Sequence, residues 1–112
     1  MNTTARGIKN EFRKNDTVCN RVVSLLHLIS NKARFRIVCM LTQGEFCVHD
    51  IAEAVGEGKL SHISQQLKIL RLAGLVEKRR DDKRVFYRIG DQHIRNVIAF
   101  LCSEYLHKKR KP

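Results

Sequence analysis

Several patterns that mark other classes of protein are missing from this 112-residue chain. It has no glycine-rich phosphate loop, no Ser-containing nucleophile elbow and no HExxH pair, so we expect no enzyme. Tryptophan is absent and only seven residues are aromatic, which disfavours the stacking platforms of RNA-binding proteins. No secretory or membrane segment is visible, because the most apolar stretch, residues 22–29, is short and contains Ser24 and His27. These absences predict a cytoplasmic protein that is not bound to a membrane.

Positive charge, in contrast, is abundant and clustered. The net charge is +11, and residues 59–88 hold nine Lys or Arg against three acidic residues. Such an excess predicts a polyanionic partner, with nucleic acid first and an anionic membrane surface second. The membrane is disfavoured because no strongly basic amphipathic helix accompanies the charge. Residues 108–112 form a further basic tail.

The periodicity of apolar residues predicts one mainly helical domain over residues 16–107, preceded by a flexible arm at residues 1–15. Helices are expected from Asp16 or Thr17 to about residue 29, then over about 32–42, 48–55 and 61–73, and after Asp91. Two strands, 75–80 and 84–89, form a β-hairpin between the last two helices. A short helix, a glycine-containing turn, a second helix and a hairpin make a winged helix-turn-helix.

The fourth predicted helix and the hairpin hold the residues expected to bind DNA. Small hydroxyls and amides early on a helix can bond base edges and phosphates, and the basic residues suit the phosphate backbone. We therefore expect DNA contacts from Ser61, His62, Ser64, Gln65, Gln66, Lys68, Arg71, Arg79, Arg80, Lys83 and Arg84. Ile63, Leu67 and Leu70 are expected on the buried side of the same helix.

These segments resemble the ArsR family of bacterial repressors. Residues 60–76 are similar to its recognition helix and following strand, residues 79–88 to its wing, and residues 31–41 and 44–52 to its second and third helices. The similarity extends over about residues 20–107. It implies a homodimeric repressor that binds a palindromic operator in double-stranded DNA and releases it when an inducer binds. An unregulated architectural or RNA-binding protein is the alternative.

The last helix offers a first candidate for the inducer site, a zinc-like metal ion. Asp91 and His93 lie near its start, while Glu104 and His107 follow 11 and 14 residues after His93. Eleven residues of helix span about 16 Å, so one helix cannot close the site, whereas two antiparallel helices of a dimer can. The arrangement resembles the last-helix zinc site of part of the family, except that Glu stands at position 104 where those proteins have His. The alternative is a helix-capping Asp91 with surface histidines.

Two groups of cysteines offer further candidates. Cys39 occupies the second-helix position at which redox and persulfide sensors of the family place a reactive cysteine. Its counterpart, Cys102, lies about one turn too early in the last helix, an offset of about 5 Å that can carry the sulfurs beyond bridging distance. Both are also compatible with a role as small core residues.

The third candidate combines Cys47, His49 and Asp50, with Cys19 from the N-terminal region. It resembles the thiolate metal sites of the family, with His49 in place of their second cysteine. A thiol near a helix N-terminus can also be reactive. The alternative is a purely structural role for these residues.

Overall fold

The computed structural model describes residues 3–56 and 59–106. His107 and the basic tail therefore lie outside the described residues. Contacts between Cα atoms divide the chain into two units, Met1–Ser30 and Asn31–Pro112. The boundary follows the first predicted helix.

The N-terminal unit contains two helices, α1 (Ala5–Lys14) and α2 (Asp16–Leu28). Within the segment predicted as a flexible arm, residues 5–14 form α1, whose N-cap Thr4 accepts a hydrogen bond from the backbone N–H of Gly7 at 3.0 Å. The available signals were the spacing of Ile8 and Phe12, four residues apart, and the cap at Thr4, although α1 buries none of its residues. Helix α2 begins at Asp16, as predicted.

Four helices form most of the second unit: α3 (Lys32–Leu41), α4 (Val48–Val55), α5 (Leu60–Leu72) and α6 (Gln92–Tyr105). The predicted starts of these four helices, and the predicted ends of the first three, are confirmed to within a residue or two. Asn31 caps α3 by accepting from the N–H of Arg34 at 3.0 Å. Gly56 ends α4 with φ +65°, in the left-handed region that glycine adopts without a steric cost. This residue starts the turn of the helix-turn-helix.

The wing is larger than predicted. Strands β2 (Val76–Asp81) and β3 (Arg84–Ile89) form the expected antiparallel hairpin, and β1 (Phe46–Cys47) adds a third strand in the order β1-β3-β2. A two-residue strand is too short to show the alternation of apolar and polar residues, which is why the sequence did not predict β1. Asp82, at φ +59°, and Lys83 form the turn.

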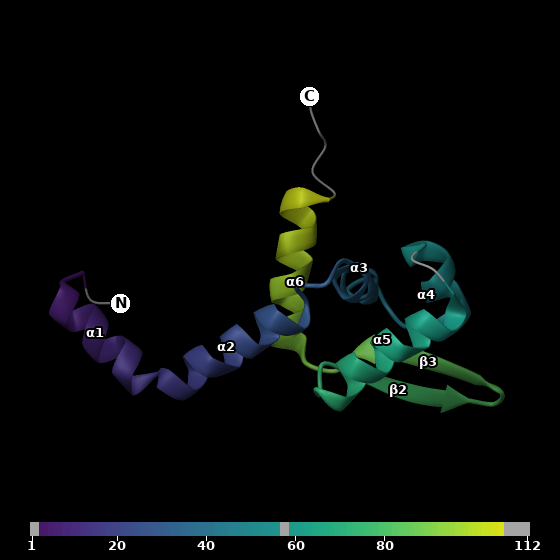
Figure 1. Cartoon of the computed structure of the whole chain (residues 1–112), viewed down its shortest axis with the longest axis horizontal. Helices are drawn as coiled ribbons and strands as arrows, with labels where there is room; N and C mark the ends of the chain where they lie inside the picture. Colours follow the sequence, from purple (N-terminus) through teal and green to yellow (C-terminus); the bar gives the residue numbers. More distant parts are fainter. Residues whose placement is uncertain (1–2, 57–58, 107–112) are drawn as a thin grey trace, which may run out of the picture. The chain divides into compact units, whose positions relative to one another are not determined.

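Helix α3 lies at the centre of the second unit. It contacts α4, α5, α6 and β3, while α5 contacts α4 and also β2 of the hairpin (Figure 1). The largest fully buried side chains of this unit come from the four helices and β2: Ile37, Val38, Leu41, Ile51, Ile63, Leu67, Leu70, Val76, Ile98 and Cys102. Helices α4 and α5 followed by the hairpin confirm the winged helix-turn-helix. No helix in the described ranges has the length and hydropathy needed to cross a lipid bilayer.

Candidate DNA interface and thiol pair

The polar and apolar sides of α5 are cleanly separated. Ile63, Leu67 and Leu70 have no solvent-exposed surface, which confirms the buried side predicted for this helix. On the opposite side, polar residues of the first turns are exposed, and their side chains make no hydrogen bond to any other described residue. These residues are Ser61, His62, Ser64 and Gln65. Their hydroxyl, imidazole and amide groups are therefore available to a ligand.

Gln66 is the exception on this helix, because its side chain is buried and bonded within the protein, which argues against the predicted contact with DNA. It is only 8% exposed, and its Oε1 accepts a hydrogen bond from Nη1 of Arg34 on α3 at 2.9 Å. The physical reason is helical spacing, since Gln66 lies three residues after Ile63 and four before Leu70 and so shares their face. Its amide joins α5 to α3. Lys68 is exposed and Arg71 half-buried further along the helix.

The predicted basic residues of the hairpin fall into two groups. Arg79 donates to both carboxylate oxygens of Glu45, with its shortest contact, from Nη2, at 2.7 Å. This hydrogen bond lowers the pKa of Glu45 below its ordinary value and raises the pKa of Arg79. Arg80 and Lys83, in contrast, are exposed and form no ion pair within the described residues.

Arg84 belongs with the first group. Its guanidinium lies 5.7 Å from the centre of the Phe86 ring, and its Nη2 is 4.0 Å from the Sγ of Cys47. A cation over an aromatic face is attracted to the ring. Arg84 therefore has neighbours on the wing itself, which distinguishes it from Arg80 and Lys83.

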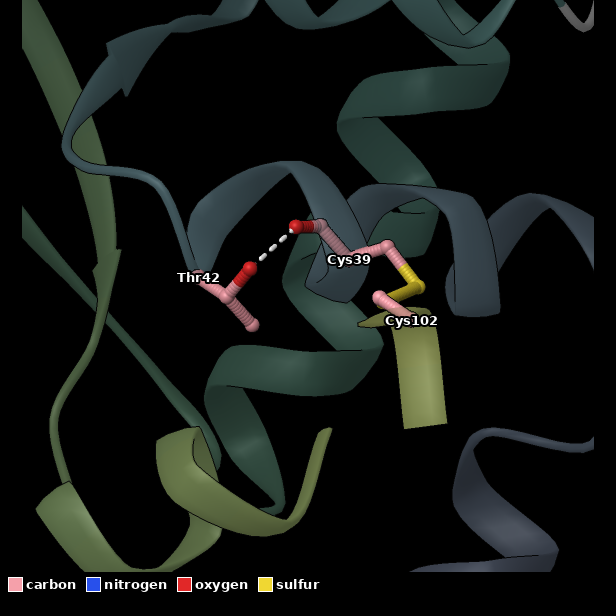
Figure 2. Close-up of a disulfide and its surroundings, with 3 residues drawn as sticks. All are labelled: Cys39, Thr42 and Cys102. Carbon is pink, nitrogen blue, oxygen red and sulfur yellow. Dashed lines mark hydrogen bonds between the residues drawn. A yellow bond between two sulfur atoms is a disulfide. The ribbon is translucent and has the colours of Figure 1, made fainter. Parts of the chain in front are cut away.

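Cys39 of α3 and Cys102 of α6 are joined by a disulfide (Figure 2). Their Cα atoms lie 6.1 Å apart, within the usual span of such a bond, although 63 residues separate them in sequence. The sequence left open whether the one-turn offset of Cys102 keeps the sulfurs apart, and the structure shows that it does not. α6 packs against α3 at this turn, and Cys102 is fully buried while Cys39 is 7% exposed. The Thr42 hydroxyl donates to the Cys39 carbonyl at 2.6 Å and closes the end of α3.

The third candidate cluster is only partly assembled. The Cys47 thiol, 7% exposed at the N-cap of α4, donates to Oδ2 of Asp50 across 3.4 Å, whereas His49 is exposed. Cys19 belongs to the N-terminal unit. No set of three or more His, Cys, Asp or Glu side chains in the described part of the chain is placed to hold a metal ion.

The residues of the predicted last-helix metal site stand apart on one chain. Asp91 caps α6, and its Oδ1 accepts from the N–H groups of His93 at 2.7 Å and Ile94 at 3.2 Å. His93 and Glu104 are exposed, and His107 lies outside the described residues. Because the predicted site needs two chains, it stays a prediction. The capping role that we gave as the alternative is observed.

Sequence reasoning missed Glu45 and Arg34, which hold the wing and α5 in place. No local signal marks either of them. Glu45 meets Arg79 only because β1 pairs with β3 and β3 with β2. Arg34 meets Gln66 only because α3 packs on α5. Both contacts depend on tertiary structure that short-range periodicity does not encode.

Comparison with known proteins gives a consistent result. The profile described as "Bacterial regulatory protein, arsR family" matches residues 31–78. The biofilm growth-associated repressor of Xylella fastidiosa is 34% identical over 92 residues, which cover 82% of this chain and 80% of that protein. Reduced HlyU from Vibrio cholerae superposes with a TM-score of 0.77 at 29% identity, over 84% of this chain and 98% of the other. The homodimeric winged helix-turn-helix DNA-binding domain Mb0332 from Mycobacterium bovis gives 0.68 at 30% identity, over 88% and 94%.

Proposed function

Because the chain belongs to the ArsR family of bacterial regulatory proteins, we propose that it is a repressor whose DNA binding is switched by the Cys39–Cys102 thiol pair. In this proposal the dithiol form binds a palindromic operator, and the disulfide form releases it. The observation that carries the proposal is the cross-link itself, which joins α6 to the helix that supports α5. Metal, which the sequence placed first among inducers, becomes the second candidate.

The DNA-binding part of the proposal rests on α5. Its four free polar side chains face solvent at the start of the helix, the position from which a recognition helix contacts base edges in the major groove. The chain also carries a net charge of +11, which supplies attraction to phosphates. Two copies of α5 separated by about one turn of DNA would bind two half-sites of a palindrome.

Dimerisation is supported by the surface of α6. Four large apolar side chains on this helix or directly after it are more than half exposed: Val97, Phe100, Tyr105 and Leu106. Apolar side chains gathered on one helix gain free energy when a partner covers them. The similarity to a homodimeric domain from Mycobacterium bovis supports a second copy of this chain as that partner.

The redox chemistry needs an external oxidant. Two thiols lose two electrons and two protons when the disulfide forms, and a small-molecule disulfide that accepts them leaves as two thiols. Exchange proceeds through attack by a thiolate and a mixed disulfide. Cys39, which retains 7% exposure, is the cysteine that meets the oxidant, and the fully buried Cys102 then displaces the leaving thiol. A disulfide in a reducing compartment is typical of a sensor rather than a structural staple.

Oxidation acts on DNA binding through α3. This helix packs against α5 and is tied to it by Arg34 and Gln66, while the disulfide fixes α6 against the same helix. If α6 also holds the dimer together, the cross-link favours a spacing of the two recognition helices that no longer fits the operator. Coupling of this kind is typically about 1–3 kcal/mol, and DNA must disfavour the disulfide by the same amount.

The last-helix zinc site has less support on this chain. The Asp91 carboxylate already accepts two backbone hydrogen bonds, and His93 and Glu104 lie at opposite ends of α6. In a dimer these residues and His107 would offer nitrogen and oxygen donors of the kind zinc accepts. This site is retained as a testable alternative to the thiol pair.

The proposal is tested with an operator selected from random duplexes by the reduced protein. We expect a palindrome, and binding about 5- to 150-fold weaker after oxidation, measured by fluorescence anisotropy. Cys39→Ser and Cys102→Ser should bind in both conditions, whereas the control Cys19→Ser should respond like the wild type. If Cys39→Ser still responds to oxidant, the thiol switch is wrong. If zinc weakens binding and His93→Ala abolishes that effect, the metal site is the sensor instead.

A further inference from the structure

The two sides of the wing carry different kinds of basic residue. Paired residues in adjacent strands point to the same side of the sheet, and successive residues point to opposite sides. The pairs Glu77–Arg88, Arg79–Phe86 and Asp81–Arg84 therefore share one side of the hairpin. Cys47, which pairs with Phe86, lies on that side as well, and Glu45 lies two residues before it. Lys78 and Arg80 point to the other side.

On the first side, the arginines are engaged by groups of the protein. Arg79 makes a bidentate contact with Glu45, lies 3.8 Å from Asp81 and stands 5.2 Å from the centre of the Phe86 ring. Bidentate charged hydrogen bonds of this type fix direction as well as distance. Arg79 therefore ties β2 to the segment just before β1.

Arg88 extends the same cluster. Its Nη2 lies 3.2 Å from Oε1 of Glu77, and its Nη1 lies 3.6 Å from Oε2 of Glu45. The Glu45 side chain is only 29% exposed, and its carboxylate lies between the guanidinium groups of Arg79 and Arg88. Glu45 therefore neutralises much of the positive charge of these two arginines. We call Glu45, Arg79 and Arg88 the wing clamp.

The hairpin tip differs from the clamp. Arg80, on the other side of β2, and Lys83, in the turn, are exposed and have no acidic partner among residues 3–56 and 59–106. An unpaired cation near the tip can release counterions from DNA without first breaking an internal ion pair. Arg79 or Arg88 would first have to break its ion pair with Glu45 before it could bind a phosphate in this way.

We propose that the basic residues of the wing divide their work: the clamp of Glu45, Arg79 and Arg88 positions the wing, and Arg80 with Lys83 makes its phosphate contacts. The inference rests on the proposed DNA binding and refines it. It replaces the expectation that all four basic residues from Arg79 to Arg84 touch DNA. Arg79 is a positioning residue in this view, acting on DNA through the orientation of β2 and β3.

The first test measures the wing without DNA. Amide hydrogen exchange in β2 and β3 should speed up in Glu45→Gln and Arg79→Gln, because each removes one partner of the clamp. Arg79→Lys should not restore slow exchange, since lysine cannot make the bidentate contact. Arg80→Ala and Lys83→Ala should leave exchange unchanged. Unchanged exchange in both clamp variants would overturn the positioning role.

The second test measures the salt dependence of operator binding. Each lost phosphate contact reduces the magnitude of the negative slope of log K against log salt by about 0.9. We expect that decrease in Arg80→Ala and in Lys83→Ala. Arg79→Lys retains a cation at position 79 and should still weaken binding. A decrease of about 0.9 in Arg79→Gln together with unchanged exchange would make Arg79 a DNA ligand and contradict the proposal.

The sign of the Glu45→Gln effect supplies a third outcome. If the only role of Glu45 were to compete with DNA for Arg79, Glu45→Gln would strengthen DNA binding more than the loss of a negative charge elsewhere on the protein. Glu53→Gln, an exposed acid on α4, is the charge-matched control. We expect Glu45→Gln to bind more weakly than this control, and stronger binding would overturn the inference. If the wild type binds no DNA, the proposed function fails, while the exchange experiment still tests the clamp.

Discussion

The recognition helix and the wing were both expected to contact DNA, and they use their polar residues in different ways. On α5, the exposed side chains of Ser61, Ser64 and Gln65 bond to nothing else in the described chain. On the wing, Arg79 and Arg88 are paired with Glu45 and Glu77. The difference follows from side-chain length and from geometry.

Short polar groups on the outer side of a helix reach no neighbouring element, so they stay free for a ligand. Arginine side chains are long enough to reach acidic residues of a neighbouring strand or of the segment before β1, so Arg79 and Arg88 form ion pairs within the protein. Gln66 shows the same rule inside α5, because its inward position brings it to Arg34. We therefore expect DNA contacts from the basic and polar residues that the fold leaves unpaired.

The largest expected effect concerns the side of α5 that faces the protein. Leu67→Ala removes a side chain with no exposed surface, and we expect a loss of about 2–5 kcal/mol in the free energy of unfolding. Leu72→Ala, on the same helix but 70% exposed, should change it by less than about 0.5 kcal/mol. Urea denaturation measures both. Equal effects would show that the two sides of α5 are not energetically distinct.

The disulfide should stabilise α5 and the wing together, since both lie between Cys39 and Cys102, within the loop that it closes. Reduction should lower the free energy of unfolding by about 2–4 kcal/mol, because the open chain gains conformational freedom when it unfolds. Denaturation with and without reductant measures the change. Cys102→Ser should be insensitive to reductant, and a wild type that is equally insensitive would argue against the cross-link.

Gln65 and Gln66 are adjacent and should behave oppositely, which sharpens the comparison at single-residue scale. Gln65→Ala should cost about 1–3 kcal/mol of operator discrimination and leave stability unchanged. Gln66→Leu should cost about 1 kcal/mol of stability, because Arg34 loses a buried acceptor, with less effect on base preference. Binding to single-base operator variants and urea denaturation separate the two. Similar profiles for both variants would contradict the assignment.

Asp91 tests the junction between the wing and α6. Asp91→Ala removes both cap hydrogen bonds and should destabilise the protein by about 1 kcal/mol. Asp91→Asn keeps a good N-cap and should be nearly neutral in thermal denaturation. If zinc no longer affects DNA binding in either variant, although Asp91→Asn is as stable as the wild type, the result would support the zinc hypothesis.

The smallest expected effect is the acid response of the wing clamp. The hydrogen bond from Arg79 lowers the pKa of Glu45 below its ordinary value of 4.5. The ion pair therefore contributes fully to stability at pH values above the ordinary pKa of Glu45, and this contribution is lost as pH falls through the lowered pKa. The NMR signal of the Arg79 Nε–H should shift on acidification, and not in Glu45→Gln. A signal that does not move across this range would mean the pair is absent in solution.

The parts of the fold that the sequence predicted are those with local causes. Caps at Asn31 and Asp91 and the left-handed Gly56 fix helix ends, and apolar spacing fixes the buried side of α5. The parts it missed depend on contacts between distant segments. Helix α1 has no buried side, β1 is two residues long, and the distance between Cys39 and Cys102 depends on how α6 crosses α3.

The central claim is that the thiol pair of α3 and α6 controls binding of α5 to DNA. It is tested most directly by measuring the operator affinity of one wild-type sample when reduced, after oxidation by a small-molecule disulfide, and after renewed reduction. We predict a loss of about 5- to 150-fold on oxidation and full recovery on reduction, with intact-mass measurements showing two hydrogens lost and regained. An affinity that stays constant while the mass reports the disulfide would contradict the account.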